Sequence, residues 1–470
     1  MRKIGLIAAV GLLALVGACN KAPKPPAEGK VGATVVEAGA ITPVPLPDSA
    51  NFPVAAATIN GWVANSDTAA IRSHAWSLWQ GMSAPSGQIL NGQNLPIWET
   101  WAGPNDVFPA TQLALAANKG APAAATLEAR LAKPRVIRNF APPLQFHHTK
   151  GAKLGALAAF GPSDVTADNK FNPQAATFID AQQPGPNGGV YSYASAAGMN
   201  KLNAAWPAGT TPQNRGINEF PTRAIETKPV FGLVTAAGLT VQPLWQGPSA
   251  STAPNNPTPN TWTTCILIAP TGTGPIRPAT SAEVTATGAQ GNACRSYLWA
   301  PMSTFYSVKL TADEAAAFAK ATGQKVAAGD FAVLLAMHVN TKEIPFWTWQ
   351  TFWWQPGGDT PNSFPGNKQG QPASLTTPWN NYASCTAYDQ TTTPGGATMQ
   401  VCFNPYLETS PGIPVGITSN CVSCHGVALV GPNPNYPAAY TKPIAFFTDP
   451  TYFDTLSTHT DFSWAVASSQ

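Results

Sequence analysis

Near the end of the chain, two cysteines and a histidine occur at a spacing that suits one particular chemistry. The segment reads Cys421-Val422-Ser423-Cys424-His425, in which two residues separate the thiols and the histidine follows at once. This is the attachment pattern for c-type haem. Each thiol adds to one vinyl group of the haem, and the imidazole then reaches the iron from one face. The pattern therefore predicts thioether bonds at Cys421 and Cys424 and an iron ligand at His425.

A Cys-x-x-Cys pair on its own has other uses. It also occurs in dithiol redox proteins and in zinc sites. The adjacent histidine favours haem over these alternatives, and over a chance match, provided that the protein is exported to a compartment where haem is attached. An export signal is therefore the next feature to look for.

The N-terminus has the features of such a signal. Arg2 and Lys3 precede an apolar run over 4–16. This run is too short for a comfortable membrane span and is bounded by small residues, as in a secretory signal. We therefore expect the chain to cross the cytoplasmic membrane. Because c-type haem is attached on the far side of that membrane, the export signal and the haem pattern support each other.

The residues at the end of the run resemble the lipobox of bacterial lipoproteins. They read Leu-Val-Gly-Ala-Cys at 15–19. The resemblance implies a signal peptide over 1–18, cleavage before Cys19 and a lipid on the thiol and amine of that residue. Asn20 follows the cysteine, which by the general lipoprotein sorting rule implies an outer-membrane anchor facing the periplasm. An ordinary signal peptide with an incidental cysteine is the alternative.

Composition indicates an exported, loop-rich protein. Only 10% of the 470 residues are charged, against a usual share of about 25%. The chain also has 47 prolines, 40 glycines and 15 tryptophans. Removal of 1–18 leaves 24 basic and 23 acidic residues, and without a basic run nothing indicates nucleic-acid binding. We expect an α+β fold that is β-rich, with long loops and a large aromatic core.

The remaining cysteines predict disulfides. Once Cys19 takes lipid and the motif takes haem, four are left: Cys265, Cys294, Cys385 and Cys402. Four cysteines allow three pairings. We favour the sequence-local one, 265 with 294 and 385 with 402, because an oxidising compartment permits disulfides. A second redox or metal site among these four is the alternative, but their spacing does not resemble one.

Local patterns predict the elements that must position the motif. Apolar residues at helical spacing over 71–82 predict an amphipathic helix that Ser66 or Asp67 caps. A capping box at 311–314 predicts another helix, which Gly323 ends. Short apolar runs bounded by turn residues predict strands at 228–234, 240–245, 261–268 and 296–299. The two most apolar strands, 331–339 and 344–354, predict a hairpin in the body of a sheet.

This hairpin and the residues before the motif carry a family resemblance. Segments 337–339, 347–352 and 402–408, followed by the haem motif, resemble a group of monohaem bacterial cytochrome c family proteins of poorly defined function. The resemblance covers the last third of the chain well and the earlier part more weakly. In some relatives the tryptophan-containing strand continues into a Phe-Glu-His-like sequence, whereas two tryptophans follow Phe352 here. A second histidine ligand at that place is therefore not implied, but His338 matches the family-like position.

A low-spin electron carrier needs a sixth iron ligand, usually methionine or histidine. No methionine follows His425, so the common downstream methionine is absent from the sequence. His338 is our first candidate and Met399, just before the motif, is the alternative. Further candidates are His459, Met337, His147 and His148. If none of them binds, the iron is five-coordinate and open to small molecules.

We expect four parts in the chain: a signal peptide over 1–18, a proline-rich tether over 19–50, a β-rich body with a few helices over 51–385, and a small haem c segment over 386–470 packed on the body. The tether is expected because its composition offers too little apolar surface to pack.

The expected function is one-electron transfer through a single covalent haem, with an unknown redox partner protein. A haem-dependent oxidoreductase with an open iron site, peroxidase-like or oxygenase-like, is the alternative. It would need a distal acid-base group, for which His338 and Glu343 are candidates. An envelope binding protein with a structural or sensory haem is a third class.

Overall fold

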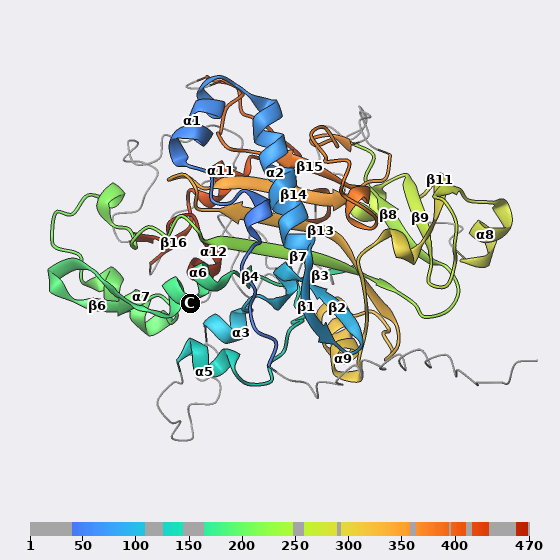
Figure 1. The fold of residues 1–470 in the computed structure, drawn as a ribbon, viewed down its shortest axis with the longest axis horizontal. Helices are drawn as coiled ribbons and strands as arrows, with labels where there is room; N and C mark the ends of the chain where they lie inside the picture. The colour runs from blue at the N-terminus through green and yellow to red at the C-terminus, as the bar shows by residue number, and fades with distance from the viewer. Residues whose placement is uncertain are drawn as a thin grey trace, which may run out of the picture. The chain divides into compact units, whose positions relative to one another are not determined.

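The described part of the chain has a mixed α+β fold (Figure 1). The structure, a computed structural model, describes residues 40–108, 126–143, 164–247, 258–288, 293–357, 363–393, 396–409, 416–431 and 457–468. The chain divides into two units, Met1–Glu37 and Ala38–Gln470, and the first unit lies outside the described residues. The predicted signal peptide, the lipid site Cys19, and the ligand candidates His147 and His148 lie outside them as well.

The helices of the described residues are α1 (Ala56–Ala64), α2 (Thr68–Ser83), α3 (Pro104–Val107), α5 (Leu127–Leu131), α6 (Pro173–Asp180), α7 (Ala196–Ala204), α8 (Ser281–Ala286), α9 (Ala312–Thr322), α10 (Pro405–Glu408), α11 (Cys421–His425) and α12 (Trp464–Ser468). None of these helices is long and apolar enough to cross a membrane.

The strands are β1 (Pro85–Leu90), β2 (Gln93–Pro96), β3 (Val165–Ala167), β4 (Lys170–Phe171), β5 (Gln182–Pro184), β6 (Val190–Ser192), β7 (Ile225–Val234), β8 (Thr240–Leu244), β9 (Thr264–Ala269), β10 (Arg277–Pro278), β11 (Ser296–Pro301), β12 (Ser307–Lys309), β13 (Phe331–Thr341), β14 (Thr348–Trp354), β15 (Tyr382–Thr386), β16 (Leu429–Val430) and β17 (Thr458–His459).

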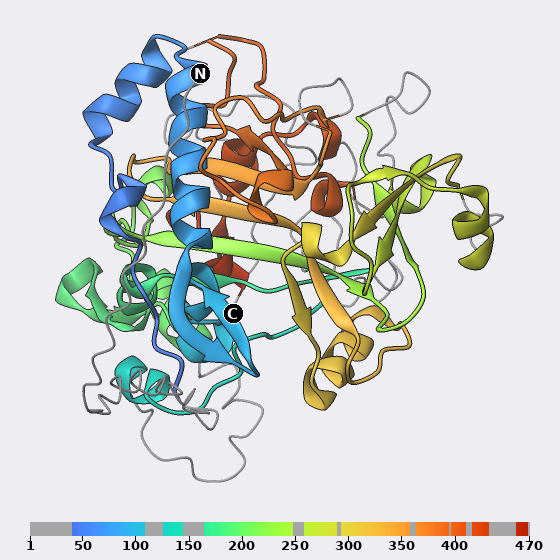
Figure 2. The ribbon, with the colours of Figure 1, turned by 45° about the vertical axis from the view of Figure 1, so that its right-hand side comes forward.

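A seven-stranded antiparallel sheet, here called the main sheet, has the strand order β15-β14-β13-β7-β3, with β12 also paired to β13 and β4 to β7. Figure 1 shows its long strands β7, β13 and β14 running side by side. β13 and β14 form the predicted hairpin, with Val339 opposite Gln350. One face of the sheet packs against α2, which runs across the strands (Figure 2). There the rings of Trp76 and Trp79 lie 5.4 and 4.3 Å from the ring of Phe352.

Several other predicted elements are confirmed. α2 begins after Asp67, whose carboxylate accepts the N–H of Ala70. α9 has a capping box from Thr311 and ends at Gly323 in the left-handed conformation. The predicted strands correspond to β7, β8, β9 and β11, and the last three build a four-stranded sheet with β10. The prediction of a β-rich fold holds only in part, because several of the sheets have just two strands.

Residues before position 50 and after position 386 make contacts with the rest of the described fold. The indole of Trp101 donates to the carbonyl of Val44 at 2.7 Å, so the chain packs on the body before the predicted tether ends. Near the C-terminus, the indole of Trp347 donates to the carbonyl of Asp461 at 2.9 Å. The residues after 386 belong to the same compact unit, Ala38–Gln470, as the predicted body.

Both disulfides have the sequence-local pairing that the cysteine spacing predicts. The Cα atoms lie 5.7 Å apart in Cys265–Cys294 and 5.8 Å apart in Cys385–Cys402, within the usual range for disulfides. The first bond joins β9 to the segment before β11. The second bond joins β15 to the segment that precedes the haem motif.

Loss of the second disulfide is expected to lower stability. The sequence separation of Cys385 and Cys402 is 17, and closure of a loop of this size contributes about 3 kcal/mol in the chain-entropy model. We predict that Cys385→Ser combined with Cys402→Ser lowers the free energy of unfolding by about this amount in urea titrations. The matched double variant at Cys265 and Cys294 should lose a similar amount. An unchanged free energy of unfolding would contradict a stabilising role for these bonds.

Candidate functional site

The predicted haem motif forms the short helix α11. Its N-cap is Asn420, whose side-chain oxygen accepts the backbone N–H of Val422 at 2.8 Å. The side-chain amide of Asn420 also donates to the carbonyl of Gln400 at 2.6 Å. The cap residue therefore starts the helix and also ties it to the segment that precedes the motif.

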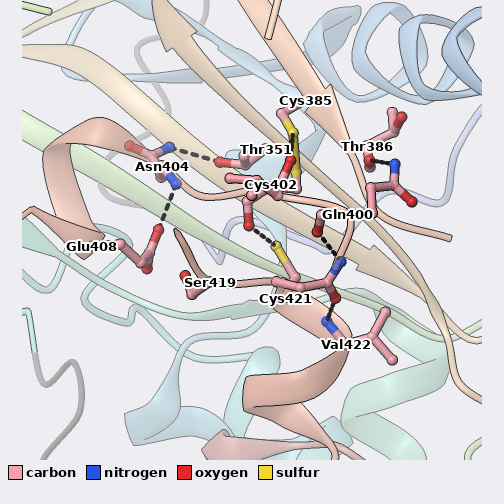
Figure 3. Close-up of a disulfide and its surroundings, with 12 residues drawn as sticks. Thr351, Cys385, Thr386, Gln400, Cys402, Asn404, Glu408, Ser419, Cys421 and Val422 are labelled. Carbon is pink, nitrogen blue, oxygen red and sulfur yellow. Dashed lines mark hydrogen bonds between the residues drawn. A yellow bond between two sulfur atoms is a disulfide. The ribbon is translucent and has the colours of Figure 1, made fainter. Parts of the chain in front are cut away.

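A disulfide connects this segment to the main sheet (Figure 3). The backbone N–H of Cys402 donates to the carbonyl of Ser419 at 3.0 Å. The thiol of Cys421 donates to the carbonyl of Cys402 at 3.4 Å. Because Cys402 is bonded to Cys385 of β15, the start of the motif is fixed close to one edge of the sheet.

The two motif thiols and the motif imidazole line a single cavity. The cavity contains about 1350 Å³ of empty space, part of which is open to solvent. Its other walls come from β7, β13 and β14, from residues 139, 141–142 and 167–169, from Glu408 of α10, and from Trp464 and Ala465 of α12. A cavity with mixed apolar and polar walls is the usual form of a cofactor or ligand site.

One wall of the cavity is the face of the main sheet that points away from α2. Side chains from β7, β13 and β14 lie in register there in two rows, Glu226–Asn340–Trp349 and Lys228–His338–Thr351. Alternate residues of a strand share a face, so each strand contributes one residue to each row. The sheet thus presents charged groups to the cavity while its other face packs against an aromatic-rich helix.

His425 has one ring nitrogen in use and the other available. Its Nδ1 lies 2.8 Å from the carbonyl oxygen of Phe462. A carbonyl oxygen can only accept, so Nδ1 carries the proton. Burial lowers the pKa of His425 to about 3, although the Phe462 bond opposes this shift, so the ring is neutral. Nε2 therefore keeps the lone pair that an iron ligand needs, and the ring of Trp349 packs 4.1 Å from the imidazole.

Cys421 and Cys424 are partly accessible from the cavity but deeply set in the protein. Burial, with a smaller contribution from the charge of Glu408, raises the pKa of both thiols above the usual value. A dithiol redox pair needs a thiol with a lowered pKa, so this environment disfavours that alternative. Within the described ranges, no group of three or more His, Cys, Asp or Glu side chains could hold a metal ion.

His338 lies in the wall of the same cavity and has a carboxylate partner. Its Nε2 lies 3.2 Å from Oε1 of Glu408. The other carboxylate oxygen accepts the backbone N–H of Asn404 at 2.5 Å, which orients the carboxylate (Figure 3). Lys228 lies directly opposite His338 on β7. Burial lowers the pKa of Lys228 to about 8, with Glu408 opposing, so imidazole, carboxylate and ammonium groups meet at this wall.

The other ligand candidates in the described residues do not line the cavity. The sulfur of Met399 accepts a hydrogen bond from the hydroxyl of Ser423 at 3.6 Å. Ser423 belongs to α11 but does not line the cavity. Met337 lies on the α2 face of the main sheet, opposite Phe352 in register. The Nε2 of His459 lies 3.0 Å from a backbone carbonyl outside the cavity. Of these described candidates, only His338 lines the cavity together with Cys421, Cys424 and His425.

Glu343, the second candidate for a distal acid-base group, is also away from the cavity. One of its carboxylate oxygens accepts the backbone N–H of Val54 at 2.6 Å and lies 3.2 Å from Nε2 of His74. These contacts hold the segment just before α1 and the middle of α2 against the β13–β14 turn. Glu343 and its partner His74 therefore connect elements of the fold, and neither lines the cavity.

The sequence analysis does not identify Glu226, Lys228 and Glu408 as residues of the site, although all of them line the cavity. Glu226 and Lys228 alternate with Thr227, a period-2 pattern that puts both on one face of a strand. This alternation is visible in the sequence, but the predicted strand begins at 228 and therefore leaves out Glu226. Glu408 has no local signal, because its role comes from a contact with His338, seventy positions away in the chain.

Comparison with protein-family models, curated proteins and solved structures finds no significant match.

The pH dependence of stability should report on Glu226. Burial raises the pKa of Glu226 to about 7, while hydrogen bonds from Ser463 and Asn340 oppose the shift. A carboxyl group with a raised folded-state pKa binds more protons in the folded state, so stability falls as pH rises from 4.5 to about 7. We predict a smaller fall in Glu226→Gln than in the wild type, from urea titrations at both ends of this range. Equal falls would mean that Glu226 titrates normally in the folded protein.

Proposed function

We propose that this chain is a c-type haem protein, and that it transfers single electrons in the cell envelope. The observation that supports this most strongly is the joint lining of one cavity by Cys421, Cys424 and His425, with Nε2 of His425 available. The residues present fit the group. Two thiols face the cavity, the imidazole has the required tautomer, and the rings of Trp349 and Trp464 lie beside the motif.

Each of these side chains has a separate task in the proposal. Bound haem would supply an iron that changes oxidation state by one electron. Cys421 and Cys424 would hold the haem through sulfur, and His425 would bind iron through Nε2. The ring of Trp349 packs on the imidazole, and the indole of Trp464 donates to the carbonyl of Cys424 at 3.2 Å. Both rings would help to exclude water from bound haem, which would lower the local dielectric and so tune the iron.

The proposal includes a location in the cell envelope and a haem segment over 386–470. Covalent haem is attached after export, in a compartment that permits disulfides, and the described cysteines outside the motif are paired with each other. This pairing leaves both motif thiols for haem. With a lipid on Cys19, a haem segment over 386–470 would face the periplasm and meet a redox partner protein there.

One observation favours a second function. His338 and Glu408 form an imidazole–carboxylate pair in the cavity, and such a pair can move a proton. If His338 binds iron through Nδ1, Glu408 is its outer hydrogen-bond partner and the iron site is closed, as a carrier requires. If His338 does not bind, the iron keeps an open position, and the chain would be a haem-dependent oxidoreductase.

Covalent haem is the first expected property. In bacterial cells that attach haem to exported proteins, intact mass spectrometry should find one haem added to the wild type. The double variant Cys421→Ala with Cys424→Ala should carry none, because no thiol is left to bond. The matched control, Cys265→Ala with Cys294→Ala, removes two cysteines away from the cavity and should keep the haem. A wild type without covalent haem would overturn the proposed function.

The reaction with carbon monoxide separates the two candidate functions. A carrier with His338 as sixth ligand should have a reduced absorption spectrum that carbon monoxide does not change. His338→Ala should open the position and make the spectrum respond. Glu408→Gln keeps the size of the partner but removes its charge, so it should leave the iron closed. If the wild type is high-spin and binds carbon monoxide, His338 is not a ligand and the oxidoreductase is favoured.

A further inference from the structure

We propose that the buried ion pair between Lys342 and Asp461 positions His425 and thereby sets how strongly its imidazole donates to iron. The consequence for iron rests on the proposed function, whereas the positioning depends only on residues that the structure describes. The pair joins the turn between β13 and β14 to the C-terminal segment 457–468, two parts of the chain that are distant in sequence.

The C-terminal segment presents one carbonyl to the imidazole through an uncommon turn. Asp461 has a φ of 47° and Phe462 a φ of 69°. Residues with a side chain seldom adopt such left-handed values, and two in succession need support from the surrounding structure. The carbonyl of Phe462 accepts the Nδ1 proton of His425 at 2.8 Å. A turn that relaxed to ordinary values would move this acceptor.

Asp461 receives support for this turn from three directions. Its Oδ1 accepts from the ammonium of Lys342 at 2.7 Å, and its Oδ2 accepts the backbone N–H of Phe220 at 2.8 Å. Its carbonyl accepts the indole N–H of Trp347 at 2.9 Å. Lys342 is held in turn by the carbonyl of Pro345 at 2.8 Å. The β13–β14 turn therefore fixes the residue next to the one that contacts His425.

The charges around the pair make it difficult to break. The side chain of Lys342 is 2% exposed and that of Asp461 is 8% exposed. Glu219 lies 3.7 Å from Lys342, but its side chain is 71% exposed, so solvent screens it. Asp461 is therefore the main compensation for a buried cation, and loss of its charge leaves that cation without an adequate partner.

The Phe462 carbonyl selects the tautomer of His425 in which Nδ1 carries the proton. Its position therefore affects how His425 would bind iron. A histidine that donates Nδ1–H to a fixed acceptor is a more basic ligand at Nε2. A more basic ligand stabilises oxidised iron relative to reduced iron. Displacement of the carbonyl should therefore weaken donation and shift the reduction potential to a more positive value.

The test compares Asp461→Asn with a comparable aspartate elsewhere. Asp180 also pairs with a cation, Arg130, and accepts a backbone N–H, that of Leu127 at 3.2 Å, but it lies at the end of α6 and is not next to a residue that contacts His425. Asp461→Asn should shift the reduction potential of the haem protein to a more positive value, and Asp180→Asn should not. A second readout needs no haem: nitrogen NMR should find Nδ1 of His425 protonated in the wild type and mixed tautomers in Asp461→Asn.

A milder variant covers the case in which Asp461→Asn does not fold. Trp347→Phe removes the indole donor to the carbonyl of Asp461 while keeping an aromatic ring at this position, and should give a smaller shift in the same direction. Wild-type potential and wild-type tautomer in the folded variants would overturn the proposal. Failure of the proposed function would appear differently, as a wild type that carries no covalent haem. In that case the NMR comparison still decides whether Asp461 positions His425.

Discussion

The hydrogen bond from Nδ1 of His425 to the carbonyl of Phe462 is the interaction on which the rest of the site depends. It fixes which ring nitrogen carries the proton and so leaves Nε2 as the single place where the imidazole can bind iron. Its two partners come from α11 and from the C-terminal segment 457–468. Each of these is held to a different part of the main sheet, the first through the Cys385–Cys402 bond and the second through Lys342.

The main sheet can support this site because its two faces have different chemistry. The face toward α2 is packed with aromatic rings, which stabilise the fold by burial. The other face carries charged residues in register, and the structure gives the buried ones partners. Glu226 accepts the hydroxyl of Ser463 at 2.8 Å, and His338 lies beside Glu408. Buried polar groups are costly without such partners, so the segments over this face are needed for stability as well as for the site.

A feature of the fold or of the site could be predicted where it depends on residues close together in the sequence. The α2 and α9 caps and the β13–β14 hairpin are local patterns, and each forms as the sequence predicts. The Cys421–His425 motif is also a local pattern, and its binding of haem stays a prediction. The disulfide pairing could also be predicted, because each bond joins cysteines that are close in the sequence.

The rest depends on contacts between distant segments. Glu408 reaches His338, and Phe462 reaches His425, only after the chain has folded. No local pattern distinguishes Met399, which contacts Ser423, from a methionine that faces the cavity. The hydrogen bond between Trp101 and Val44, within the predicted tether, is likewise a tertiary contact.

Iron bound through Nε2 of His425 is the feature on which the proposed function depends, and X-ray diffraction at the iron absorption edge tests it most directly. The crystals would contain protein produced in cells that attach haem. We expect one iron peak in the cavity lined by Cys421 and Cys424, within bonding distance of Nε2 of His425. A cavity without iron, or iron bound elsewhere while His425 keeps only its Phe462 contact, would contradict the proposed function.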